Sequence, residues 1–66
     1  MTGQPSPRQL EVLRHLAEGL RDQDISKVMF VSAPTTRRQV KLLLNKLGAR
    51  NRAQAVHIGH QRGLIT

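Results

Sequence analysis

Residues 31–48 limit the possible folds of this chain more than any other stretch, because they contain a helix start, an apolar stripe and a helix end. Ser32 is a favourable N-cap, Pro34 is tolerated in a first helical turn, and Gly48 is typical of the residue just past a helix end. Between them, apolar side chains recur at the i, i+3, i+4, i+7 spacing of one buried helical face, at Val40, Leu43, Leu44 and Leu47. At about 100° per residue, Arg38 and Lys41 lie on the opposite side. We therefore expect a helix over residues 33–47 with an apolar inner face and a cationic outer face.

Two helix signals precede this stretch. Ser6, Pro7 and Gln9 form the pattern of a capping box with a proline in the first turn, which predicts a helix over about residues 7–18 that ends at Gly19. Residues 22–29 predict a short second helix with Asp22 as its cap. We expect its inner face, and the corner that follows it, to be formed by Ile25, Val28, Met29, Phe30 and Val31.

A third signal follows Gly48. Asn51 and Gln54 form a second capping-box pattern, which predicts a helix over about residues 52–62, with Ala55, Val56 and Gly59 facing inward. The whole chain, residues 1–66, is then one all-α domain, a four-helix bundle. Its helices 22–29 and 33–47 are joined by a tight link, which is the helix-turn-helix pattern.

The distribution of charge favours a polyanionic partner. The net charge is +7, all four acidic residues precede residue 25, and the eight Lys and Arg residues after that point have no acid among them. This asymmetry points to nucleic acid first. With a single aromatic residue, Phe30, the chain is a poor candidate for stacking single-stranded bases. The alternative is a charge excess that serves only solubility.

Other function classes find little support. The chain has no cysteine, no apolar run near the ~20 residues of a membrane span, and no hydrophobic segment of a secretory signal, so we expect a cytoplasmic protein. No nucleophile and base are paired and no glycine loop could cradle a phosphate, so we expect neither catalysis nor a cofactor. His57 and His60 have a workable spacing for a metal, but no carboxylate or cysteine lies nearby in the sequence, and we predict no metal site.

Several separated motifs occur in the order typical of one family. They are Glu11-Val12-Leu13, Leu16-Ala17-Glu18-Gly19, Lys46-Leu47-Gly48, Arg52-Ala53-Gln54-Ala55-Val56 and Gly63-Leu64-Ile65. On these motifs the chain resembles the LuxR-type (GerE- or FixJ-type) DNA-binding domain of bacterial transcription regulators. Departures occur as well. The family's Asn-Lys-Glu-Ile-Ala is here Asp22-Gln23-Asp24-Ile25-Ser26, and its Thr-Val-Lys-x-His is here Thr35-Thr36-Arg37-Arg38-Gln39.

The resemblance implies sequence-specific binding of double-stranded DNA, with the helix over residues 33–47 in the major groove. The family's groove-facing side chains correspond to Arg37, Arg38 and Lys41, which we predict to contact bases. Phosphate contacts are predicted for residues at the two ends of this helix and the start of the next, namely Ser32, Thr35, Lys46, Arg50 and Arg52. Thr35 could instead bond only within its own first turn. Because Asp22 replaces an Asn that in the family often lies near the phosphate backbone, that contact is in doubt.

The resemblance also implies a homodimer, since members of the family often dimerise through their last helix. The outward side chains of residues 52–62 are Ala53, His57, His60 and Gln61. A second hypothesis is a protein-interaction module that keeps the fold but docks to RNA polymerase or another regulator, through Leu42, Pro34 and the histidine face. The chain is either a stand-alone protein or an output domain cut from something longer.

Overall fold

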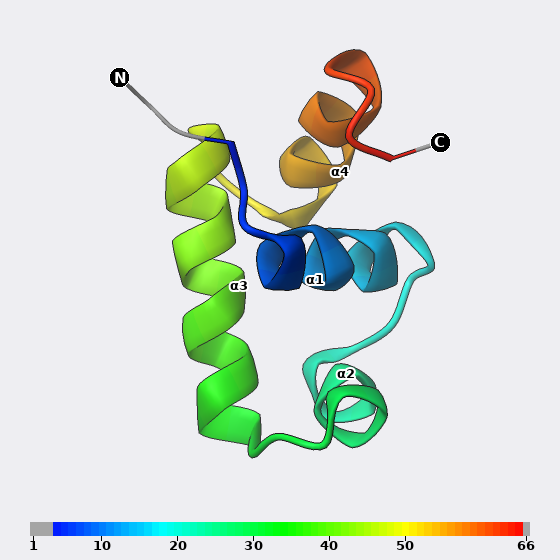
Figure 1. The fold of residues 1–66 in the computed structure, drawn as a ribbon, viewed down its shortest axis with the longest axis vertical. Helices are drawn as coiled ribbons and strands as arrows, with labels where there is room; N and C mark the ends of the chain where they lie inside the picture. The colour runs from blue at the N-terminus through cyan, green and yellow to red at the C-terminus, as the bar shows by residue number, and fades with distance from the viewer. Residues whose placement is uncertain (1–3, 66) are drawn as a thin grey trace.

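Four helices account for the architecture (Figure 1). The computed structural model describes residues 4–65, and residues 1–3 and 66 of the predicted domain lie outside the described residues. The helices are α1 (Pro7–Ala17), α2 (Asp22–Met29), α3 (Ala33–Leu47) and α4 (Arg52–Gln61), with no strand among the described residues. The long α3 runs along one side of the molecule. Helix α2 lies at its N-terminal end, α1 near its middle and α4 at its C-terminal end (Figure 1). The predicted all-α, four-helix fold is confirmed.

The predicted helix ends are close to the observed ones because the capping residues act as expected. Ser6 Oγ accepts the Gln9 N–H at 3.1 Å and Gln9 Oε1 accepts the Ser6 N–H at 2.8 Å, which completes the capping box of α1. Helix α1 ends one residue earlier than predicted, with Glu18 as its C-cap. Helix α4 also ends one residue early, and its capping differs in one bond. Asn51 Oδ1 accepts the Gln54 N–H, but Gln54 Oε1 accepts the N–H of Arg50 instead of that of Asn51.

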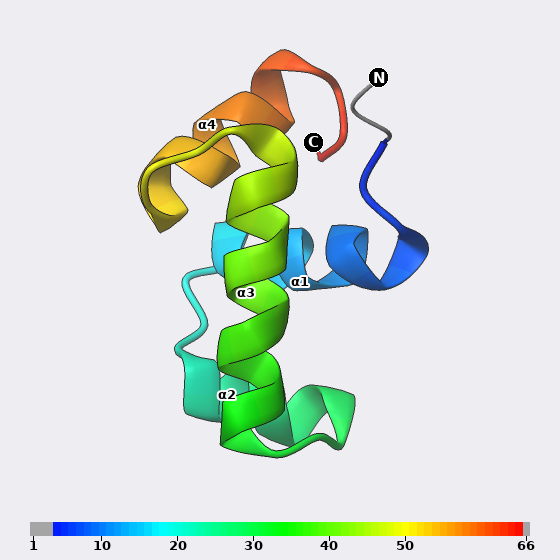
Figure 2. The same cartoon turned by 90° about the vertical axis from the view of Figure 1, so that its left-hand side faces the viewer.

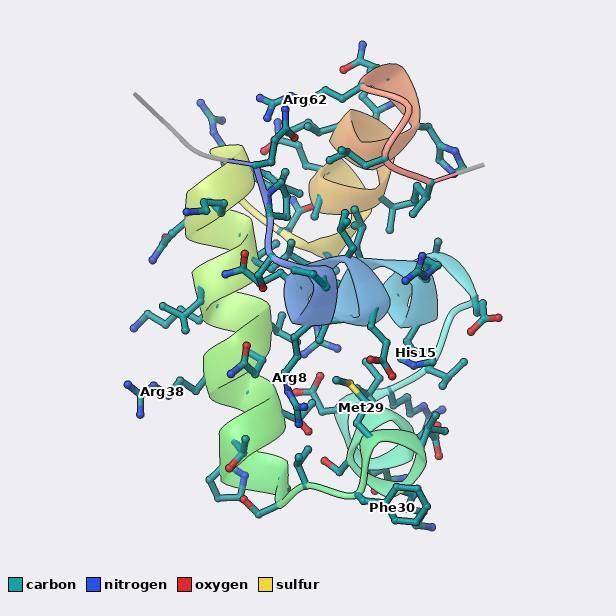
Figure 3. The ribbon with its side chains drawn as sticks, in the orientation of Figure 1. Arg8, His15, Met29, Phe30, Arg38 and Arg62 are labelled. Carbon is teal, nitrogen blue, oxygen red and sulfur yellow. The ribbon has the colours of Figure 1, made fainter. Side chains whose placement is uncertain are left out.

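The prediction of α2 was wrong in three details. Its N-cap is Arg21 and not Asp22, and the Asp24 carboxylate accepts the Arg21 N–H at 3.4 Å. Val28, predicted to face inward, is 49% exposed, and Phe30, predicted to cover the corner, is 93% exposed. Phe30 has a left-handed backbone (φ 58°, ψ 45°) at the C-cap of α2, and its side chain projects away from the helices (Figure 3).

The orientation of α2 explains the exposure of Val28. Ser26 is buried and its hydroxyl faces Thr36 of α3 at an Oγ–Oγ1 distance of 2.7 Å. The buried stripe is therefore centred between Ile25 and Ser26, and at about 100° per residue Val28 lies roughly 110° from that centre, outside the stripe. A purely apolar stripe, as the sequence predicted, would have placed Val28 inside.

The apolar core joins all four helices and the C-terminal tail. Its buried members are Val12, Leu13, Leu16, Ile25, Val40, Leu43, Leu47, Ala55 and Ile65. Gly59 lets α4 approach α1, since a Cβ at this position would lie 2.9 Å from Leu13 Cδ2 and 3.1 Å from Ile65 Cγ1. The predicted inner faces of α3 and α4 are thus confirmed, with Leu44 and Val56 only partly buried. Over residues 4–65, no helix has the length and apolar character needed to cross a membrane.

Candidate nucleic-acid interface

The outer face of α3 is open to solvent along its first turns. Arg37, Arg38 and Lys41 are exposed, while Thr36 and Val40 of the same turns are buried. The other three helices lie behind α3 when it is viewed from outside (Figure 2), and Arg38 extends away from all of them (Figure 3). None of the ion pairs within residues 4–65 involves these three cations. Their charges are therefore available to an external partner.

The start of α3 is held by a local hydroxyl pair. Ser32 Oγ accepts the Thr35 N–H at 3.2 Å and donates to Thr35 Oγ1 at 2.8 Å. Both residues are exposed. The Thr35 hydroxyl thus accepts a hydrogen bond within its own first turn, which was the alternative to a phosphate contact. Its own hydrogen can still be donated to an outside group.

The cations at the far end of α3 and the start of α4 differ in their surroundings. Lys46 is half-buried and Arg50 is exposed, and neither has an acidic partner in the described part of the chain. Arg52 does have one, because its Nη2 lies 2.6 Å from Oδ1 of Asp22. The predicted phosphate contacts thus include one cation whose charge is already matched inside the molecule.

The outward face of α4 has the predicted residues. Ala53, His57, His60 and Gln61 are all exposed, and Ala55 and Gly59 lie buried on the opposite side. A shallow hollow of about 280 Å³ adjoins His60 and is lined by Arg14, Ala17, Glu18 and Ile65. Among residues 4–65 no three His, Asp or Glu side chains converge on one point as metal ligands would. His15 instead lies between two carboxylates of its own helix, Glu18 at 3.2 Å and Glu11 at 3.7 Å.

A known family combines this helical arrangement with these motifs. The family model described as bacterial regulatory proteins, luxR family, matches residues 5–59. The protein belongs to the luxR family.

Relatives of this luxR-family chain include regulators from two bacterial genera. It is 41% identical over 58 residues to the uncharacterized transcriptional regulatory protein YxjL of Bacillus subtilis, covering 88% of this chain and 27% of the relative. It is 35% identical over 63 residues to the transcriptional regulatory protein YdfI of the same species, a match that covers 96% of this chain and 30% of YdfI. It is 36% identical over 61 residues to the putative HTH-type transcriptional regulator Mb0914c of Mycobacterium bovis, a match that covers 92% of this chain and 7% of Mb0914c. The chain therefore spans less than a third of the length of these relatives.

A solved structure shares the fold. The crystal structure of the response regulator ChrA in a heme-sensing two-component system superposes with a TM-score of 0.90 at 30% identity. The match covers 96% of this chain and 31% of that one. The four-helix arrangement of the luxR-family domain is thus found within a larger regulator.

Two polar contacts of this luxR-family domain were missed by the sequence analysis. One is the buried hydroxyl pair of Ser26 and Thr36, and the other is the ion pair of Asp22 and Arg52. A signal for the first was present, because both residues occur where the motifs of the family have Ala and Val. Two polar replacements at positions that face each other indicate a hydrogen bond. No local signal joins Asp22 to Arg52, which lie far apart in the sequence and meet only in the fold.

Proposed function

We propose that this luxR-family domain binds duplex DNA sequence-specifically, with α3 in the major groove, and that it regulates bacterial transcription. The observation that carries the proposal is the pairing of opposite faces on α3. Arg37, Arg38 and Lys41 are exposed and form no ion pair within residues 4–65, and the leucine face of the same helix anchors it in the core. A helix held rigidly by one face can place the side chains of the other face at fixed positions in a groove.

The residue types fit the chemistry of base recognition. The planar guanidinium of Arg can donate two parallel hydrogen bonds to O6 and N7 of guanine, a contact that distinguishes this base in the major groove. Arg37 and Arg38 are the candidates for such contacts, with Lys41 one turn further along α3. Ser32, Thr35, Lys46, Arg50 and Arg52 are proposed to contact phosphates, which position the domain without selecting a sequence.

We further propose that the domain binds as a homodimer through the outward face of α4. The small side chain of Ala53 allows close approach, and His57, His60 and Gln61 form an exposed polar surface around it. The hollow beside His60 offers space for a side chain of the second copy. Such a dimer would read two half-sites about one helical turn apart.

A protein partner is the second candidate. Leu42 is 42% exposed on the outer side of α3 and Pro34 is also exposed, which favours some apolar contact on this side of the molecule. RNA polymerase or another regulator would be such a partner. Against this stands the group of exposed cations on the same helix, which fits a polyanion better than an apolar protein surface.

Equilibrium DNA binding of Arg38→Ala tests the proposal. Loss of a bidentate guanine contact should cost about 1–3 kcal/mol on the preferred duplex and relax the base preference at that position. Arg50→Ala should weaken binding to all duplexes alike. It should also reduce the slope of log affinity against log salt by about 0.9, the value for one phosphate contact. Lys27→Ala, an exposed cation on α2, is the matched control and should change neither property.

Two results would speak against the proposal. The first is that Arg38→Ala leaves both affinity and preference unchanged, which would show that the assignment of α3 to the major groove is wrong. The other is that the domain retains a protein partner in a DNA-free pull-down while it shows no gel shift at physiological salt. That second result would favour the docking function instead.

A further inference from the structure

One ion pair joins the first helix of the helix-turn-helix to α4. Asp22 is the first residue of α2 and Arg52 is the first residue of α4, and the two helix starts lie on the same side of α3 (Figure 2). Arg52 Nη2 lies 2.6 Å from Asp22 Oδ1. The Asp22 side chain is 22% exposed and that of Arg52 is 47% exposed. The carboxylate is thus the inner member of the pair and the guanidinium the outer one.

One oxygen of the inner carboxylate has Arg52 as its charged neighbour. Asp22 Oδ1 is shielded from water and, within residues 4–65, receives no hydrogen bond of good geometry. A shielded carboxylate oxygen without hydrogen bonds is costly unless an opposite charge lies close to it. Arg52 supplies that charge.

The position of Asp22 is also linked to α3. The Ser26 hydroxyl donates to the backbone oxygen of Asp22 at 2.9 Å, and so it accepts its 2.7 Å hydrogen bond from the Thr36 hydroxyl. Hydrogen bonds therefore link Thr36 on α3 through Ser26 to the backbone of Asp22, and the side chain of the same residue pairs with Arg52. The backbone from which this carboxylate extends is thus held relative to α3.

The ion pair changes what Arg52 can contribute to binding a polyanion. A cation that neutralises a phosphate releases condensed counterions, and this release drives much of the affinity for DNA. A guanidinium already matched by a carboxylate has less charge to offer, and the carboxylate itself repels phosphate. Lys46 and Arg50, by contrast, have no acidic partner in the described part of the chain.

We infer that Asp22 lowers the affinity of this domain for the nucleic-acid backbone by competing with phosphate for Arg52. The inference rests on the proposed function, since it concerns the strength of the same DNA contact. It assigns Asp22 a role in how tightly duplexes of any sequence are held. Base preference remains with Arg37 and Arg38. The exchange of the family's Asn for Asp at this position is then a change of affinity and not of specificity.

Asp22→Asn tests this inference, with Asp24→Asn as the matched control. Both remove one negative charge from the first turn of α2, but the Asp24 carboxylate contacts the Arg21 N–H and not Arg52. Asp22→Asn should bind duplex DNA about two- to fivefold more tightly at fixed salt, the range of an exposed ion pair. Its plot of log affinity against log salt should also be steeper, by at most about 0.9, the value for one fully neutralised phosphate. Asp24→Asn should show a smaller gain. Thermal unfolding of each variant establishes that binding is measured on folded protein.

Arg52→Gln separates the ion pair from a general effect of charge. In the Arg52→Gln background, Asp22→Asn should give no more than the small gain of Asp24→Asn. The inference is overturned if Asp22→Asn binds no better than Asp24→Asn, or if its full gain persists without Arg52.

A heparin column keeps this test independent of the proposed function. Heparin is a polyanion without bases, so Asp22→Asn should elute at higher salt than Asp24→Asn whether or not a preferred duplex exists. Retention of the wild-type protein on heparin without any binding to duplex DNA would contradict the proposed function. The order of elution would still decide the role of Asp22.

Discussion

The two faces of α3 differ in what holds them. On the inner face Thr36, Val40, Leu43 and Leu47 are buried against the other three helices, whereas on the outer face Arg37, Arg38 and Lys41 form no ion pair within the described residues. Stability and recognition therefore depend on different side chains of one helix, which are neighbours in the sequence. Substitutions on either face should therefore affect one property without the other.

The largest effect is expected at the centre of the inner face. Leu43 is fully buried, and Leu43→Ala should lower the free energy of unfolding by about 2–5 kcal/mol because it removes apolar contacts and leaves a cavity. Chemical denaturation measures this loss. A change below about 1 kcal/mol, the ordinary effect of a point mutation, would show that α3 is not anchored by this face.

The buried hydroxyl pair of Ser26 on α2 and Thr36 on α3 should give the next largest effect. Ser26→Ala would leave the buried Thr36 hydroxyl without its partner, at a cost of about 1–3 kcal/mol. The double variant Ser26→Ala with Thr36→Val replaces both partners by apolar groups and should recover most of that loss. Equilibrium unfolding of the two single variants and the double variant measures the coupling. Additive losses would mean that the hydrogen bond does not join α2 to α3.

The smallest effect on stability is expected at Leu42, next to Leu43 but 42% exposed on the outer side. Leu42→Gln should change the free energy of unfolding by no more than about 0.5 kcal/mol. Its DNA affinity should also stay within about twofold, since Leu42 is not among the side chains proposed to contact bases or phosphates. Loss of a protein partner in a pull-down, with DNA binding intact, would instead support the docking hypothesis.

The separation of the two faces of α3 was predictable because local signals determine it. Ser32 and Gly48 mark the ends of the helix, and its apolar period identifies the buried side without reference to any other helix. The exposure of Arg37 and Arg38 follows from the same period. For this reason the sequence was sufficient to place the candidate interface.

Helix α2 was less predictable because its orientation depends on a partner. It has only eight residues, so its period is short, and it turns Ser26 and not Val28 toward α3. Hydrophobicity alone cannot identify a buried serine. The left-handed backbone of Phe30 likewise follows from the path between α2 and α3, since a large side chain rarely favours that conformation. The Asp22–Arg52 pair required the fold itself.

Selection of bound sequences from a random pool of duplex DNA shows whether the outer face of α3 reads bases. For the wild-type protein we predict enrichment of one motif in two half-sites, with centres about 10 base pairs apart. The Arg37→Ala, Arg38→Ala double variant should lose that preference while it keeps its fold. Recovery of the same motif by the double variant, or of no motif by the wild-type protein, would show that Arg37 and Arg38 on the outer face of α3 do not read bases.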